Sequence, residues 1–107
     1  MIKSLIYNCQ GNNLFIDIGD NIKIIYNNKI YYVKKEQLEQ NFLSILNITY
    51  EWHKEYINLS EIDGINWNLE IIFKDNSRKE YYGHGNFPYN FNSFKSEIQK
   101  IIEKVVL

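Results

Sequence analysis

The chain contains few of the residues that mark secreted, disulfide-linked or membrane-spanning proteins. Its 107 residues include one cysteine, Cys9, which excludes an internal disulfide and a multi-cysteine zinc site and fits a reducing compartment. No apolar run approaches the roughly 20 residues that span a bilayer, and the segment 1–9 is too short and too polar for a signal-peptide core. We therefore predict a cytoplasmic protein without a membrane partner.

An excess of either charge is also absent. The formal net charge is -1, acidic and basic residues are mixed along the whole chain, and Arg78 is the only arginine. The sequence thus shows no basic segment for a nucleic-acid backbone, and we expect no direct contact with nucleic acid. Abundant Ile, Asn, Lys, Tyr and Phe beside a single arginine indicate an AT-rich coding sequence, as in many bacteria and phages.

The composition is that of a folded protein. Hydrophobic residues make up 45% of the chain and aromatic residues 16%, too many large apolar groups for a disordered polypeptide. A length of 107 residues supports one core, and we predict a single domain over residues 1–107.

Alternating hydrophobic residues predict three β-hairpins. In the first, residues 2–9 and 14–18 are strands joined by the turn residues of "QGNN". The second joins residues 22–26 to 29–34 through Asn27 and Asn28, because asparagine tolerates positive φ.

The third predicted hairpin contains the clearest strand of the chain. The sequence "INWNLEIIF", residues 65–73, places Ile, Trp, Leu, Ile and Phe on one face, and residues 78–83 return beside it after the turn residues 75–77.

Two amphipathic helices are predicted by apolar residues at steps of three and four. The first follows Lys35 and ends near Asn47, and the second covers residues 91–105 with Asn90 as its N-cap. Between them, residues 48–64 combine helical spacing with turn residues, and we predict a short helix followed by a loop. The fold class is then α+β: an antiparallel sheet of about five or six strands, packed on one face by a central helix and a C-terminal helix.

The segment "YYGHGNFPYNF", residues 81–91, holds two of the five glycines and the only proline. We interpret it as a strand-to-helix turn, with glycines for unusual backbone angles and Pro88 before the helix. A phosphate-binding loop would usually have a lysine at a fixed offset from its glycines, and this segment has none. Histidine can act as a general base near neutral pH, but the sequence indicates no convincing nucleophile or acid beside His84.

Other chemical sites receive less support from the sequence. A triad of Cys9, His84 and Asp63 has no motif around the cysteine. A zinc site of His53, His84 and a carboxylate is likewise disfavoured. Trp52 and Tyr56, four residues apart, form either an exposed binding stripe or, as is more common for large aromatics, a pair packed on the sheet.

The second half of the chain resembles a pattern found in small bacterial and phage-borne proteins. Its landmarks are Trp52, Tyr56 and Asn58, then Asp63-Gly64 before Trp67, and finally Tyr-x-Gly and Phe-Pro-x-Asn-Phe within residues 81–91. Where that family usually has asparagine two residues after the glycine, this chain has Gly85, which also accepts positive φ. The resemblance implies an α+β fold among immunity proteins and anti-CRISPR-like inhibitors of bacterial defence systems, and it supplies no catalytic residues.

We therefore expect a non-enzymatic protein without cofactor or metal. Its expected partner is a bacterial nuclease effector, such as a CRISPR effector, or a toxin, which it blocks by direct binding. The candidate binding residues are Trp52, Tyr56, Tyr81, His84 and Asn86. Three alternatives stay open: a small-ligand or nucleotide-binding accessory protein with a pocket around Tyr81, His84 and Trp52, a hydrolase that depends on His84, and a homodimer formed through an edge strand.

Overall fold

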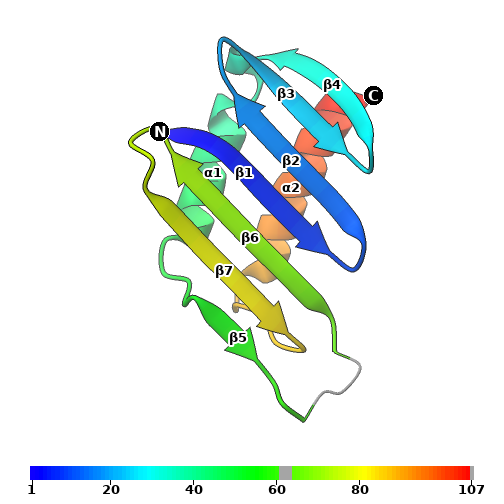
Figure 1. Cartoon of the computed structure of the whole chain (residues 1–107), viewed down its shortest axis with the longest axis vertical. Coiled ribbons are helices and arrows are strands. Elements are labelled where there is room, and N and C mark those ends of the chain that lie inside the picture. The colour runs from blue at the N-terminus through cyan, green and yellow to red at the C-terminus, as the bar shows by residue number, and fades with distance from the viewer. Residues whose placement is uncertain (61–63, 107) are drawn as a thin grey trace.

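The fold is one seven-stranded sheet with two α-helices on one of its faces (Figure 1). It is described by a computed structural model that covers residues 1–60 and 64–106. The strands and helices, in chain order, are β1 (Ile2–Cys9), β2 (Asn12–Ile18), β3 (Asn21–Tyr26), β4 (Lys29–Lys34), the 3₁₀-helix η1 (Lys35–Gln37), α1 (Glu39–Thr49), β5 (Glu55–Ile57), β6 (Asn66–Phe73), β7 (Arg78–His84) and α2 (Phe91–Val106).

The strands lie in the order β4-β3-β2-β1-β6-β7-β5. Leu5 in the central part of β1 has Ile16 of β2 on one side and Ile71 of β6 on the other, so β1 joins the N-terminal hairpins to the C-terminal one. Neighbouring strands are antiparallel except β5, which runs parallel to β7.

The hairpin turns have the backbone angles that their residue types predict. Gln10 and Gly11 have φ of 48° and 81°, and Asn27 and Asn28 have φ of 47° and 71°. Two successive residues with positive φ characterise the type I′ turn, whose twist matches that of paired strands. In the third hairpin Asn76 has a φ of 68°, so asparagine again takes the left-handed conformation.

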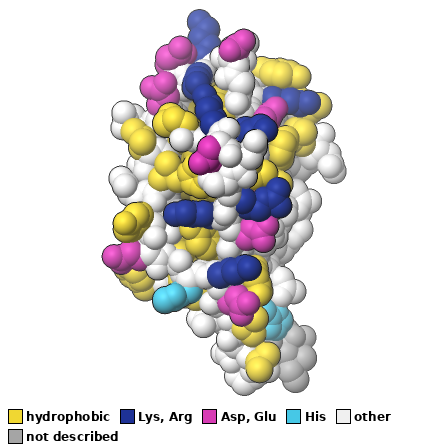
Figure 2. Space-filling model, turned by 60° about the vertical axis from the view of Figure 1, so that its left-hand side comes forward, with side chains coloured by type: hydrophobic (Ala, Val, Ile, Leu, Met, Phe, Trp, Pro, Cys, Tyr) yellow, Lys and Arg dark blue, Asp and Glu magenta, His cyan; other side chains and the backbone are white. Residues whose placement is uncertain are grey.

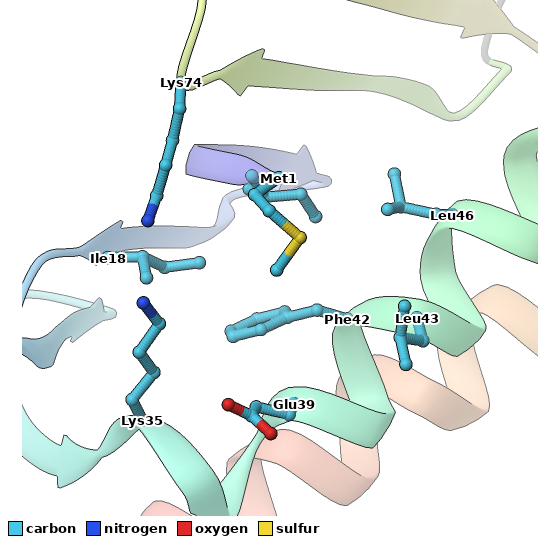
Figure 3. A pocket seen from close by; sticks show the side chains of 9 residues that line it. Met1, Ile18, Lys35, Glu39, Phe42, Leu43, Leu46 and Lys74 are labelled. Atoms are coloured by element: carbon cyan, nitrogen blue, oxygen red, sulfur yellow. The ribbon is translucent and has the colours of Figure 1, made fainter.

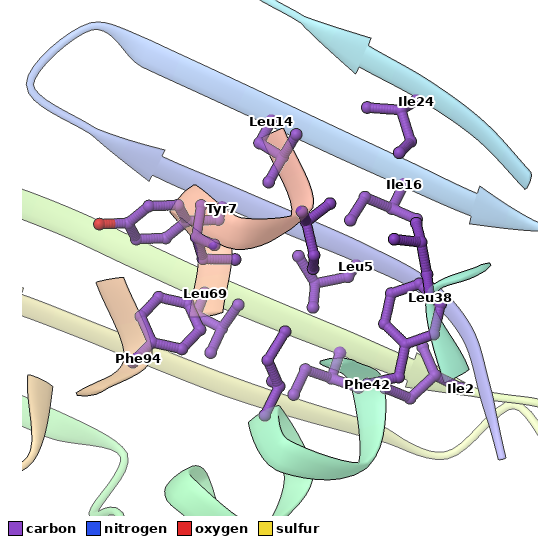
Figure 4. Packing of buried hydrophobic residues seen from close by; sticks show 14 of the residues in the cluster. Ile2, Leu5, Tyr7, Leu14, Ile16, Ile24, Leu38, Phe42, Leu69 and Phe94 are labelled. Atoms are coloured by element: carbon purple, nitrogen blue, oxygen red, sulfur yellow. The ribbon is translucent and has the colours of Figure 1, made fainter. Parts of the chain in front are cut away.

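The core lies between the helices and one face of the sheet. Leu5, Ile16 and Leu69 point from the central strands toward the helices, where Phe42 of α1 and Phe94 of α2 meet them (Figure 4). Ile45 and Ile71 belong to the same buried cluster. Strand side chains alternate between the two faces of the sheet. Both α-helices of the described residues lie on the core side, so within this part of the chain the opposite face has no helix over it (Figure 1).

The α+β fold class is confirmed, with a mixed sheet of seven strands rather than an antiparallel sheet of five or six. The difference arises in residues 48–64, where the predicted short helix is wrong. Helix α1 continues to Thr49, and the chain then forms β5 along the edge of β7. This strand is fixed by non-local hydrogen bonds, from Tyr82 N–H to the Lys54 carbonyl at 3.0 Å and from Asn58 N–H to the His84 carbonyl at 2.9 Å.

Within residues 1–60 and 64–106, no helix has both the length and the apolar character needed to cross a membrane.

Candidate functional site

The five predicted binding residues come together at one end of the sheet, but most of them belong to the core. Trp52 and Tyr81 are buried, with 8% and 6% of their surface exposed. The ring centroid of Trp52 lies 5.8 Å from that of Trp67 and 5.5 Å from that of Tyr81, and Tyr56 lies 6.1 Å from Trp67. These aromatic residues therefore form a packed cluster around Trp67, and Trp52 and Tyr81 offer little surface to a partner.

The polar ends of this cluster are hydrogen-bonded within the protein. The Trp52 indole N–H donates to the Asn90 side-chain oxygen at 2.6 Å, and the Asn90 amide donates to the Ile48 carbonyl at 2.8 Å. Asn90 precedes α2 as expected, but its side chain joins the Trp52 indole to the end of α1 instead of capping its own helix. The Tyr81 hydroxyl donates to the Thr49 carbonyl at 3.5 Å, and burial raises the Tyr81 pKa above its ordinary value.

The glycines of residues 81–91 shape the backbone, as the sequence predicts, but in two different ways. Gly83 faces Trp67 across the strands and leaves room for the indole, whose N–H donates to the Asn86 carbonyl at 2.9 Å. Gly85 has a φ of 63°, a conformation that favours glycine, and its N–H donates to the Ile65 carbonyl at 3.0 Å. The Asn86 side chain accepts from the Phe87 N–H at 2.9 Å and so also belongs to this corner.

His84 lies on the uncovered face of the sheet, away from Cys9. Its Nδ1 is 2.6 Å from the Asn66 side-chain oxygen, in the cross-strand pair Asn66 and His84. Cys9 pairs with Trp67, whose side chain lies on the helix-covered face. The nominal triad is therefore not assembled, since its cysteine and histidine point to opposite faces, and Asp63 lies outside the described residues. Among the described residues, no group of three or more His, Cys, Asp or Glu side chains is placed to hold a metal ion.

The uncovered face carries a continuous row of apolar side chains, which we call the apolar row. Its four members are opposite one another on adjacent strands, from the edge inward: Ile30, Ile25, Phe15 and Ile6. Ile30 is 54% exposed, and Tyr32 beside it on β4 is 69% exposed. Ile6, Phe15 and Ile25 are half-buried. A sheet face in contact with water ordinarily carries polar residues, so this row departs from the usual pattern.

Polar residues border the apolar row on both sides. Asn13, Asn8 and Asn68 are opposite one another on β2, β1 and β6 and form a parallel row of amides. This row ends at Tyr82, whose hydroxyl donates to Glu55, a contact that raises the Tyr82 pKa. Basic and acidic side chains lie interspersed among hydrophobic ones on the side of the molecule seen in Figure 2. The apolar row is thus bordered by the amide row on one side and by Asp17 and Lys23 on the other.

A separate apolar hollow of about 180 Å³ opens between the sheet and α1. Its lining includes Met1, Ile18, Phe42 and Leu46, and the ammonium groups of Lys35 and Lys74 point toward each other at its edge (Figure 3). Lys35 lowers the Lys74 pKa, first through a side-chain hydrogen bond that favours the neutral Lys74 amine and second through the repulsion between two positive charges. Glu39 lies lower on the same wall. The hollow can accept an apolar group that carries a negative charge at one end.

Comparison of the chain with protein-family models, curated proteins and solved structures finds no match.

The sequence contained a signal for the apolar row that the predictions above do not use. In "NLFIDI" and "IKIIY", Phe15 and Ile25 fill positions whose neighbours on both sides are apolar and buried or half-buried. A strand with one face in water should have polar residues at those positions. Consecutive large apolar residues in a strand of a one-sided sheet therefore point to a surface with a binding role.

Proposed function

We propose that the protein is a non-catalytic inhibitor of the immunity type, which binds a bacterial nuclease effector or a toxin through the uncovered face of its sheet. The observation that carries the proposal is the apolar row, because a row of large side chains on a sheet without a covering layer favours burial against another protein. The nature of the partner is supported by the sequence pattern of residues 52–91, which resembles that of immunity proteins and defence-system inhibitors.

The dimensions of the face suit a protein partner. The molecule measures 44 × 28 × 21 Å, and the sheet is seen face-on down the shortest axis (Figure 1). A stable protein interface covers roughly 800 Å² of each partner, which a face of this extent accommodates. Protein interfaces combine an apolar centre with a polar rim. The apolar row and the asparagine row beside it supply both.

The chemistry of the row favours a protein over a charged polymer. Lys23 and Asp17 are directly opposite each other beside the row, so their charges offset each other. Glu70 continues the row beyond Ile6, followed by Glu80. Arg78 contacts both carboxylates at 3.4 Å, which compensates part of their charge. A phosphate backbone would meet no concentration of positive charge on this row.

The test uses purified protein and a panel of purified nuclease effectors and toxins, with dissociation constants and effector activity as readouts. Phe15→Thr with Ile25→Thr removes the centre of the apolar row while keeping β-branched residues in the strands. We expect at least a tenfold loss of affinity and of inhibition, which corresponds to about 1.4 kcal/mol. The control is Tyr89→Thr, which removes a side chain that is 90% exposed in the segment before α2. Inhibition that survives the double substitution, or no binding to any panel member, contradicts the proposal.

A second candidate function is small-ligand binding, and the hollow of Figure 3 favours it at a place different from the one predicted. Trp52 and Tyr81 are occupied by core contacts, whereas Lys35 and Lys74 face each other beside an apolar floor. We propose an amphipathic anion, such as a medium-chain carboxylate, as the ligand class.

This second proposal is tested by NMR titration with octanoate, with octanol and octylammonium as matched probes. We expect octanoate to shift the resonances of Met1 and Leu46, and Lys74→Met to weaken its binding while leaving that of octanol unchanged. Equal shifts with octanoate and octylammonium, or no shift with octanoate, contradict the role of the lysine pair.

A further inference from the structure

The sheet has one long exposed edge, formed by β4. The opposite edge, β5, is three residues long, whereas β4 has six residues and pairs on one side only, with β3. An unpaired edge presents a row of free N–H and C=O groups to other strands. The edge of β4 therefore offers the larger number of free backbone groups.

The register of the β3–β4 hairpin identifies those groups. A two-residue turn is closed by a hydrogen-bonded pair, here Tyr26 and Lys29, and such pairs alternate along an antiparallel ladder. Lys29, Tyr31 and Val33 consequently bond to β3, and Ile30, Tyr32 and Lys34 direct their N–H and C=O groups away from the sheet. The Lys34 N–H donates to the Gln37 side chain at 3.2 Å. Within the described residues, the backbone groups of Ile30 and Tyr32 have no such partner.

We propose that β4 pairs with β4 of a second copy of the chain, antiparallel and about a two-fold axis at Tyr31. In this register Ile30 lies opposite Tyr32 of the partner subunit, and Tyr32 lies opposite Ile30 of the partner subunit. Each of these is a hydrogen-bonded pair that exchanges two N–H···O bonds, so every free group of Ile30 and Tyr32 is satisfied. The helices of both copies then lie on the same side of one continuous sheet.

The side chains of β4 complement themselves in this register. Ile30 and Tyr32 are 54% and 69% exposed on the uncovered face, and each pairs with the other type, which buries an aliphatic group against a ring. Lys29 faces Val33 of the partner subunit, and Lys34 lies beyond the paired residues, so lysines do not oppose each other. A register centred on Tyr32 would place Lys34 opposite Ile30 of the partner subunit as a hydrogen-bonded pair. It would need the Lys34 N–H, which already donates to the Gln37 side chain.

The pairing ends at two copies, because a two-fold contact uses the same strand of both subunits and leaves no further β4 edge. Dimerisation through β4 does not depend on the proposed function, because it is measured on the protein alone. In the dimer Ile30, at the end of each apolar row, lies opposite Tyr32 of the partner subunit, so the two rows lie next to each other with an offset of two residues along β4.

The first experiment is sedimentation equilibrium of the protein alone from low to high micromolar concentration, with Tyr32→Pro and Tyr32→Val as variants. We expect the mass to rise from 12.9 kDa to twice that value. Proline at residue 32 removes an N–H that points away from β3, so the hairpin tolerates it while pairing is blocked. Tyr32→Val keeps that N–H and should still dimerise, with weaker affinity. A wild-type protein that is monomeric at every concentration overturns the proposal.

The second experiment tests the register and does not depend on a proline. In a Cys9→Ser background, Tyr31→Cys places two thiols at the two-fold axis, where the Cα atoms of a non-hydrogen-bonded pair are about 4.5 Å apart and permit a disulfide. We expect mild oxidation to cross-link this variant and not Val33→Cys, whose partner residue is Lys29. Cross-linking of Val33→Cys in preference to Tyr31→Cys overturns the register.

Discussion

Trp67 lies across Gly83, its partner on the neighbouring strand, so closely that a Cβ atom on residue 83 would be 2.3 Å from the indole Nε1. The same Cβ would be 2.8 Å from the Asn86 carbonyl oxygen, which accepts the indole hydrogen bond. Gly83 is therefore required for space, and the position of Trp67 in the aromatic cluster depends on it.

The first prediction follows from this contact. Gly83→Ala should lower the free energy of unfolding by about 1–3 kcal/mol, because the methyl group overpacks a buried site against a backbone oxygen and a large ring. Urea unfolding monitored by tryptophan fluorescence measures the effect. The control is Gly19→Ala, where the nearest atom to the new methyl group is 3.7 Å away and stability should change little. Equal stability of the two variants would contradict the role of Gly83.

The second prediction concerns Asn90, which bonds to both Trp52 and Ile48. Asn90→Asp would serve equally well if the residue acted only as a helix N-cap. We expect it instead to destabilise the protein by about 1–3 kcal/mol, because the aspartate lacks the donor for the Ile48 carbonyl and brings a negative charge to it. Thermal unfolding of Asn90→Asp and of the exposed control Asn92→Asp distinguishes the two roles.

The third prediction concerns the polar contact between the two helices. Buried Asn41 of α1 donates to Glu97 at 3.1 Å and accepts from Lys104 at 2.8 Å, both from α2. Asn41→Ala should reduce stability by about 1–3 kcal/mol, since it leaves the partly buried Glu97 carboxylate without this donor. Gln40→Ala, on the exposed side of the same helix, is the matched control in a denaturant titration. A loss no greater than that of the control would show that the contact contributes nothing.

The fourth prediction concerns Asp75 in the turn between β6 and β7. Its carboxylate accepts from the Ser77 N–H at 2.9 Å and from the Ser77 hydroxyl at 2.6 Å, and these bonds lower the Asp75 pKa from its ordinary 3.8. The contribution to stability is then present above the unfolded-state pKa and is lost as the pH falls through the lower folded-state pKa. Ser77→Ala should raise the Asp75 pKa, measured by NMR titration of its carboxyl carbon. An unchanged pKa would exclude the hydroxyl as its cause.

Local features of the fold could be predicted from the sequence because each depends on a few adjacent residues. Asn27-Asn28 determines its own turn, and the spacing of Phe91, Phe94 and Ile98 places α2. Strand β5 could not be predicted, since a segment of three residues has no periodicity to detect and forms by pairing with β7. Its formation is a tertiary effect that overrides local preference.

The candidate site was predicted less well than the fold. Trp52 and Tyr81 are aromatic residues of the kind that anchor interfaces, yet the structure buries both of them around Trp67. Residue type alone does not distinguish an interface aromatic from a core aromatic. The apolar row can be identified only when the register of the pairs β1–β2, β2–β3 and β3–β4 is known. Its members are adjacent in space but far apart in the chain.

The central position of β1 has a consequence for synthesis. On the ribosome, β1 to β4 emerge early and can pair with one another. The other edge of β1 stays unpaired until β6 has been synthesised, since Leu5 pairs with Ile71. Contacts between such distant segments slow folding, and an unpaired apolar strand is prone to aggregation while it waits. The nascent chain thus exposes the strand on which the finished sheet is built, so we expect translation rate and chaperone supply to affect the yield of native protein.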